Sequence, residues 1–355
     1  MYATIQASRA VAAIIVVLYH LGGTIALDKY FGQTVFATAF SFGHAGVDFF
    51  FVLSGFIITY VHWNDFGTPG KLLSYAKKRA ARIYPIYWVV FLLVSVGAYA
   101  YPGLRDSIPS DPLLLIKSLA LVPQDKLVVG GTGAPVLIVA WSLQYELLFY
   151  VAMALFIASV RLGLIAVLCL AVVSLLNWKT SVFPASFIAN EWLFLFGMGA
   201  LVGAFSRTDR PIASPKTWAA LGVAVFFGAA FFEVFFAEKE VEALRWAYGS
   251  GSAIAILGLV QMEDRGMTKD WNPPWLLKLG DASYALYLIH FPLISLLCKL
   301  AMKVGLHGLI GATLTFAVVF LLCLLSGLLL HIGVEKPLLN RLSSKRARPW
   351  PAYSH

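Results

Sequence analysis

Four ionisable residues stand inside long apolar runs of this sequence, where a charged side chain needs a reason. They are His20, Asp48, Glu146 and His290. A charge near the centre of a bilayer costs about 2.5–3.5 kcal/mol even on a lenient insertion scale. Counted at ~1.5 Å per residue from the inferred cytoplasmic end of each helix, they lie roughly 19, 22, 20 and 16 Å deep. This shared depth predicts one polar cavity built by four helices.

Within that cavity, His20 is the expected general base, because an unperturbed imidazole titrates near pH ~6.5. Glu146 or Asp48 would orient the imidazole and stabilise its cation, as the acid does in hydrolase triads. The segment SYALYLIH at 283–290 places Tyr287 and His290 on one helix face. Either side chain is a candidate hydrogen-bond donor to a developing oxyanion. Each of these roles is a hypothesis.

A second group of candidates is basic and lies nearer the membrane edge. Arg9 is eleven residues before His20, so the two share one stripe of a helix and lie about 16 Å apart along it. Arg79 and Arg82, spaced i and i+3 in the loop expected before the third apolar run, would present guanidinium forks to phosphate oxygens, with Lys78 adding charge. The alternatives are a snorkelling anchor for Arg9, and topology or lipid contact for the cluster.

The elements that must position these residues are membrane helices. The chain is 60% hydrophobic and only 13% charged, with a mean hydropathy of +0.80, which is typical of an all-α polytopic integral membrane protein. A crossing needs about 20 helical residues. About ten runs fit, and the fifth is short: 8–27, 46–63, 83–101, 137–159, 163–177, 186–206, 217–237, 243–262, 280–302 and 308–333.

Charge sets the expected orientation. With ten spans, about two thirds of the 27 lysines and arginines fall on the side of the N-terminus, which predicts that both termini are cytoplasmic. We expect a transmembrane domain over 1–340 and a basic cytoplasmic tail over 341–355. The net charge of +9 is explained by this topology, so no nucleic-acid partner is expected. The three cysteines have no metal-type spacing, and we expect no metal site.

Six motifs, in order, resemble the membrane-bound acyltransferase 3 family. They are Arg9…His20 within SRAVAAIIVVLYH, then GVDFFFVLSGF, KKRAARIYPIYW, WSLQYELLFY, SYALYLIH and EKP at 335–337. The chain is most similar to the short, ExoZ-like members that acetylate exopolysaccharides, or to those that acetylate the lipopolysaccharide O-antigen. The resemblance covers almost the whole chain. Relatives with an extra SGNH-type domain are longer, and we expect none here.

The resemblance implies ten core helices and an acyl-CoA donor, usually acetyl-CoA, whose acyl group passes to a sugar hydroxyl. It points to Arg9 and His20 in the first helix and to the Arg79/Arg82 pair. The expected partners are acyl-CoA, a polysaccharide or lipid-linked glycan, and the bilayer of a bacterial inner membrane. Whether the chain forms a homo-oligomer stays open. The alternative function is a proton-coupled transporter or exporter of a glycan or small solute, with the buried ionisable residues as its relay.

Overall fold

The computed structural model describes residues 2–100, 108–177, 180, 182–208, 210–236, 242–268 and 273–343. Over these residues the chain is helical and contains no strand. The α-helices are α1 (Ala3–Ile25), α2 (Val35–Ala39), α3 (Ala45–His62), α4 (Leu72–Ala100), α5 (Pro112–Leu119), α6 (Lys126–Val129), α7 (Trp141–Ala158), α8 (Val160–Leu176), α9 (Ala185–Ile188), α10 (Trp192–Ser206), α11 (Pro215–Phe236), α12 (Glu242–Asp264), α13 (Pro274–Asp281), α14 (Ser283–Lys303), α15 (Gly308–Leu330) and α16 (Lys336–Ser343). A π-helical turn, His331–Glu335, joins α15 to α16.

All ten predicted apolar runs are helical, which confirms the all-α membrane class. Within the described part of the chain, nine helical segments are long and apolar enough to cross a membrane. The tenth is α8, a shorter apolar helix of 17 residues, in the place where the sequence predicted the shortest span. The predicted tail beyond Ser343 lies outside the described residues.

One predicted boundary is wrong in a way that affects the site. The basic cluster KKRAAR does not lie in a loop, because α4 begins at Leu72 and carries the cluster in its first three turns. Alanine, lysine and arginine are strong helix formers, so nothing in this segment stops the helix. Pro85 lies inside α4 and does not end it. Arg79 and Arg82 are therefore held on a rigid helix.

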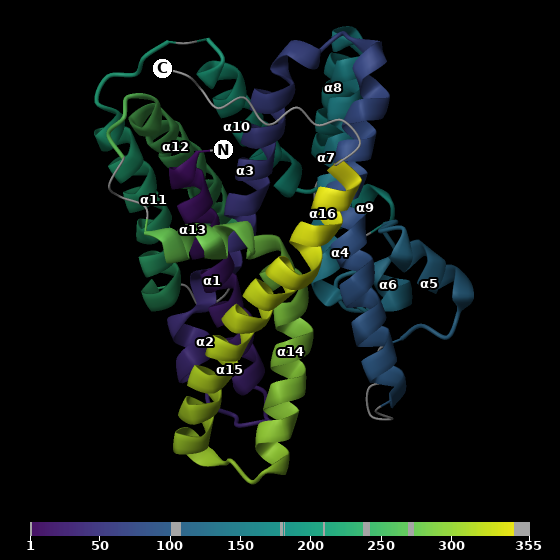
Figure 1. The fold of residues 1–355 in the computed structure, drawn as a ribbon, viewed down its shortest axis with the longest axis vertical. Coiled ribbons are helices and arrows are strands. Elements are labelled where there is room, and N and C mark those ends of the chain that lie inside the picture. Colours follow the sequence, from purple (N-terminus) through teal and green to yellow (C-terminus); the bar gives the residue numbers. More distant parts are fainter. Residues whose placement is uncertain are drawn as a thin grey trace.

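Long helices run in alternating directions, and contacts between their ends show it. Near the start of α1, the Thr4 amide donates to Glu263 at the end of α12, over 2.8 Å. Before α4, the Gly67 amide donates to the Phe156 carbonyl near the end of α7, over 2.9 Å. Figure 1 shows α14 and α15 joined at the opposite end of the molecule, with α16 crossing beside α4. The start of α1 and the connection between α14 and α15 thus mark opposite ends of the bundle.

Helix α3 lies at the centre and packs closely on α10. The approach depends on glycine: a Cβ added to Gly199 would lie 1.8 Å from the Val52 carbonyl oxygen, and one added to Gly55 would lie 2.1 Å from that of Phe196. Small residues at a helix interface let backbones approach closely in a membrane. Aromatic rings fill the space beside this seam, where Phe149 stacks on Phe196 at 4.5 Å. This packing fixes α3, whose first turns line both cavities described below.

Candidate functional site

Two cavities open between the helices, and they differ in chemistry. The first, which we term the basic cavity, has a volume of about 690 Å³. Its charged lining is rich in cations and lies towards the start of α1 and α4. The charged residues that line it are Arg9, Lys78, Arg79, Arg82, Lys336, Glu146 and Asp281. Five cations against two carboxylates make this cavity suited to a polyanion.

The second cavity, which we term the aromatic cavity, has a volume of about 480 Å³. It lies further along α1, where that helix contributes His20. Among the described residues, its charged lining consists of two aspartates, one lysine and one arginine, so their formal charges cancel. The aromatic and charged residues that line it are Tyr19, Trp141, Tyr145, Phe183, Phe187, Trp192, Tyr287, Asp48, Asp125, Lys126 and Arg245.

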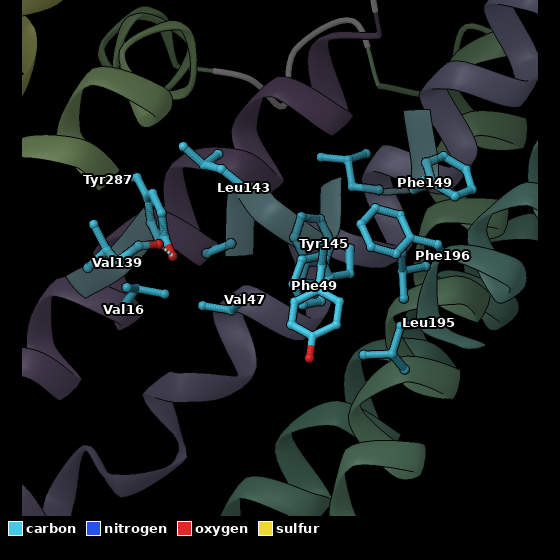
Figure 2. Close-up of a cluster of buried hydrophobic side chains, with 14 of the residues drawn as sticks. Val16, Val47, Phe49, Val139, Leu143, Tyr145, Phe149, Leu195, Phe196 and Tyr287 are labelled. Atoms are coloured by element: carbon cyan, nitrogen blue, oxygen red, sulfur yellow. Dashed lines mark hydrogen bonds between the residues drawn. The ribbon is translucent and has the colours of Figure 1, made fainter. Parts of the chain in front are cut away.

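Val47 and Tyr287 line both cavities and form the partition between them. The Tyr287 hydroxyl donates to the Val139 carbonyl over 2.9 Å and lies 2.7 Å from Ser142 Oγ. Figure 2 shows Tyr287 directed towards Val139, with Val16 and Val47 beside it. The Tyr287 hydroxyl proton is thus engaged by a backbone carbonyl, so a hydrogen bond from Tyr287 to a reacting group would require this contact to break.

His20 and His290 form a hydrogen-bonded pair. His290 Nε2 lies 3.0 Å from His20 Nδ1, and His290 Nδ1 lies 3.2 Å from the Leu286 carbonyl oxygen. A carbonyl only accepts, so neutral His290 carries its proton on Nδ1 and accepts at Nε2. His20 then donates from Nδ1, which also lies 3.1 Å from the Val16 carbonyl. His20 lines the aromatic cavity, and this arrangement leaves its Nε2 as the ring nitrogen with a lone pair.

The four ionisable residues predicted to share one cavity are divided by the structure. His20 and Asp48 line the aromatic cavity, Glu146 lines the basic cavity, and His290 is fully buried behind His20 and lines neither. Glu146 accepts hydrogen bonds from Ser54 and from Tyr150. Equal depth in a membrane does not give equal position around the bundle axis, which is why the sequence could not separate them. The partner that orients the His20 ring is thus a second histidine.

The two arginines of the basic cluster have different surroundings. Arg82 Nη1 lies 2.7 Å from Glu335 Oε1, and His331 Nδ1 lies 2.8 Å from the other oxygen of that carboxylate. Glu335, in the EKP motif, is buried. Arg79 has no carboxylate partner in the described part of the chain. Its guanidinium lies over the rings of Tyr75 and Tyr150, at 5.9 and 5.7 Å. Arg79 is therefore the arginine of the pair that is available to a bound anion.

Arg9 and Lys78 complete the cations of the basic cavity predicted from the sequence. Arg9 donates to Gln6 over 3.2 Å and to Ser283 over 2.9 Å, which are both neutral side chains. Lys78 lies one residue before Arg79 on α4 and lines the same cavity. Arg9 and His20, predicted to lie on one stripe of α1, therefore serve different cavities along that helix.

The sequence analysis missed two ionisable side chains that line the aromatic cavity, Arg245 and His44. Arg245 contacts Glu191, lies 3.8 Å from Asp48 and lies over the Trp192 ring at 4.9 Å. His44 Nε2 lies 3.0 Å from Glu233 Oε1. Arg245 and His44 sit near span ends, where ionisable residues are common, so nothing in the pattern marked them out. Among the described residues, no group of three histidine, cysteine, aspartate or glutamate side chains is arranged to hold a metal ion.

Comparisons with known proteins agree with the six motifs. A family model described as an acyltransferase domain matches residues 2–331. The chain is 30% identical over 315 residues to the exopolysaccharide production protein ExoZ of Rhizobium meliloti (strain 1021), covering 86% of this chain and 93% of that protein. It is 26% identical over 372 residues to the acyltransferase MdmB of Streptomyces mycarofaciens, covering 91% and 88% respectively. No solved structure matches the chain significantly.

Proposed function

Because the chain belongs to the acyltransferase domain family, we propose that it moves an acyl group, normally acetyl, from cytoplasmic acyl-CoA to a sugar hydroxyl on the other side of the membrane. The observation that carries the proposal is the placement of His20. Its Nδ1 is held by His290, and His20 lines a cavity that shares two lining residues with the basic cavity.

The basic cavity is the proposed donor site. Acyl-CoA carries three phosphate groups, and Arg9, Lys78 and Arg79 line this cavity without a carboxylate contact in the described part of the chain. Arginine pairs with phosphate through two parallel hydrogen bonds, and lysine adds a point charge. Arg82 is held by Glu335, so its role is to fix α4 against the π-helical turn. The distribution of basic residues along the sequence supports a cytoplasmic position for this end of the bundle.

The acceptor enters the aromatic cavity in this scheme. The acyl thioester reaches it past the partition formed by Val47 and Tyr287, since these two residues line both cavities. The charged headgroup stays among the cations, while the uncharged pantetheine arm extends along α1 towards His20. Arg9 and His20 are eleven residues apart, or about 16 Å along the helix.

The chemical step then needs only one proton acceptor. The acceptor hydroxyl attacks the thioester carbonyl carbon as its proton passes to His20 Nε2. The resulting tetrahedral intermediate collapses, the carbon–sulfur bond breaks, and the thiolate of CoA takes the proton from His20. The products are an O-acyl ester and CoA, with no net change in the protein. His290 keeps the His20 ring oriented and accepts the hydrogen bond from Nδ1, the part that a carboxylate plays in hydrolase triads.

A covalent variant uses the same residues. His20 Nε2 attacks the thioester first, CoA leaves, and the acceptor hydroxyl then takes the acyl group from the imidazole. Labelled acyl-enzyme that accumulates in the absence of acceptor would distinguish this route from direct transfer.

The relatives narrow the acceptor class. Similarity to an exopolysaccharide production protein supports an exported polysaccharide, or its lipid-linked precursor, as the acceptor. Lipopolysaccharide O-antigen is a second acceptor of the same chemistry. The multi-pass architecture and the cytoplasmic donor fit the inner membrane of a bacterium.

The test uses the full chain in lipid nanodiscs with acetyl-CoA and polysaccharide fractions, and it measures CoA release and acetyl ester formation. We expect His20→Ala to abolish transfer while acetyl-CoA still raises the thermal stability of the variant, because the basic cavity is intact. A His20→Ala protein that still transfers acetyl groups would overturn the mechanism. If acetyl-CoA neither stabilises the protein nor is consumed, and solute flux in liposomes follows a pH gradient, the transporter is correct.

A further inference from the structure

The lining of the aromatic cavity indicates which class of sugar it would bind. Resting on the proposed function, the geometry points to a neutral hexopyranose as the sugar bound in this cavity, with its ring against the side chains of Trp141, Tyr145 and Trp192. A sugar that carries a carboxylate is disfavoured. The inference rests on three features of the lining. They are the arrangement of the aromatic rings, the carboxylate contacts of Arg245, and one buried amide.

The ring arrangement provides an apolar wall. Trp141 and Trp192 lie 4.4 Å apart between centroids, and Tyr145 lies 5.0 Å from Trp192. Phe187 stacks on Tyr145 at 4.2 Å and also lines the cavity. Pyranose rings present axial C–H groups on one face, and such faces pack on the electron-rich faces of aromatic rings. The rings are tilted by 42° between Trp141 and Trp192 and by 67° between Tyr145 and Trp192, so they form an angled apolar wall. Contact with this wall costs little entropy, because the side chains are already ordered against one another.

Arg245 would be the natural partner of an acidic sugar, but its charge is already compensated. It contacts Glu191, lies 3.8 Å from Asp48 and lies over the Trp192 ring. A guanidinium flanked by two carboxylates offers no net positive charge to a ligand. The remaining charged side chains of the lining, Asp125 and Lys126, also cancel. A carboxylated sugar would therefore lose hydration here while facing described charged residues whose formal charges sum to zero.

One buried amide points to a ligand with hydroxyl groups. Gln124 is 7% exposed and lines the aromatic cavity. Its amide nitrogen donates to Ser118 Oγ over 3.1 Å, whereas its Oε1 has no hydrogen-bond partner in the described part of the chain. A buried acceptor without a partner costs about 1–3 kcal/mol. A hydroxyl group of a bound sugar donates the hydrogen bond that would satisfy this acceptor.

The experiment measures binding by calorimetry, without donor, using the full chain in nanodiscs. The probes are neutral gluco- and galacto-oligosaccharides and the same oligosaccharides oxidised at C6 to the carboxylate. We expect at least one neutral probe to bind at least about tenfold tighter than its oxidised counterpart. Glu191→Gln removes one carboxylate from Arg245, so the same ratio should fall by about fivefold or more. Trp192→Ala should weaken neutral binding by about fivefold, and Trp192→Phe should weaken it less.

Tighter or equal binding of the oxidised probes by the wild-type protein would overturn the inference. An unchanged ratio in Glu191→Gln would also contradict it, because Arg245 would then not be the group that sets charge preference. Thermal stabilisation by acetyl-CoA reports whether each variant is folded. The two proposals fail separately: probes that bind with the expected preference but never receive an acyl group refute the transfer step alone.

Discussion

His290 Nε2 lies 3.0 Å from His20 Nδ1, and the His290 ring is fully buried. His290 is held in turn by the Leu286 carbonyl one helical turn earlier. The pair therefore joins α14 to α1 through two imidazoles and orients the ring of His20 at the aromatic cavity. A histidine serves here as the positioning residue for another histidine, and this allows the pair to stay neutral in the membrane interior, where an ionised carboxylate is expensive.

The first prediction concerns that pair. His290→Ala should lower kcat for acyl transfer by about 10²–10⁴-fold, because His20 loses the contact that sets its orientation and tautomer. The KM for acetyl-CoA should change little, since His290 lines neither cavity. Steady-state kinetics in nanodiscs give both constants. A variant with an unchanged kcat would mean that the Val16 carbonyl alone orients His20.

The second prediction separates the two arginines of α4. Arg79→Gln should raise the KM for acyl-CoA and weaken the salt dependence of donor binding, because Arg79 is free to contact phosphate. Arg82→Gln should instead lower the free energy of unfolding by up to about 3 kcal/mol. The buried Glu335 carboxylate then loses its arginine partner and keeps only the contact with His331.

The matched control for Arg82 is the double variant Arg82→Gln with Glu335→Gln. It should recover much of the lost stability, because no buried charge is then left uncompensated. Equal effects of Arg79→Gln and Arg82→Gln on donor KM, with no loss of stability for either, would contradict this division of roles.

The third prediction tests the partition between the cavities. Val47→Phe should block acyl transfer and leave acetyl-CoA binding to the basic cavity intact, because a larger side chain at a residue shared by both linings closes the route to His20. Val47→Ile adds a single methylene group and serves as the control, with a smaller loss of kcat. Thermal shift with acetyl-CoA measures binding, and ester formation measures transfer. Transfer at the wild-type rate by Val47→Phe would show that the acyl group takes another path.

The fourth prediction tests the packing of α3 on α10 and has an internal control. Gly199→Ala should destabilise the protein by about 1–3 kcal/mol, because the new Cβ would lie 1.8 Å from the Val52 carbonyl oxygen. Gly197→Ala, two residues earlier on the same helix, should be neutral or stabilising, because nothing lies within 4 Å of its added Cβ. Thermal unfolding in detergent compares the two, and a reversed order would exclude close backbone contact at this seam.

Several features of the protein were determined by the sequence alone. Apolar runs of about 20 residues predict the helical spans, because a bilayer requires every backbone polar group to be satisfied within the segment. Ionisable side chains inside these runs are rare for the same energetic reason, so His20, Asp48, Glu146 and His290 stand out without a structure. The predicted start of the third span was wrong, because Lys77–Arg82 were interpreted as a polar loop although these residues favour a helix.

The tertiary structure decided which of these residues meet. Depth along a helix follows from residue number, but position around the bundle depends on how ten helices pack. Glu146 is therefore on the basic cavity and Asp48 on the aromatic cavity, although their predicted depths are almost equal. The pairing of Arg82 with Glu335 joins residues 253 positions apart, and that of His20 with His290 joins residues 270 apart. Such contacts depend on side-chain packing between helices, which the local pattern of a sequence does not encode.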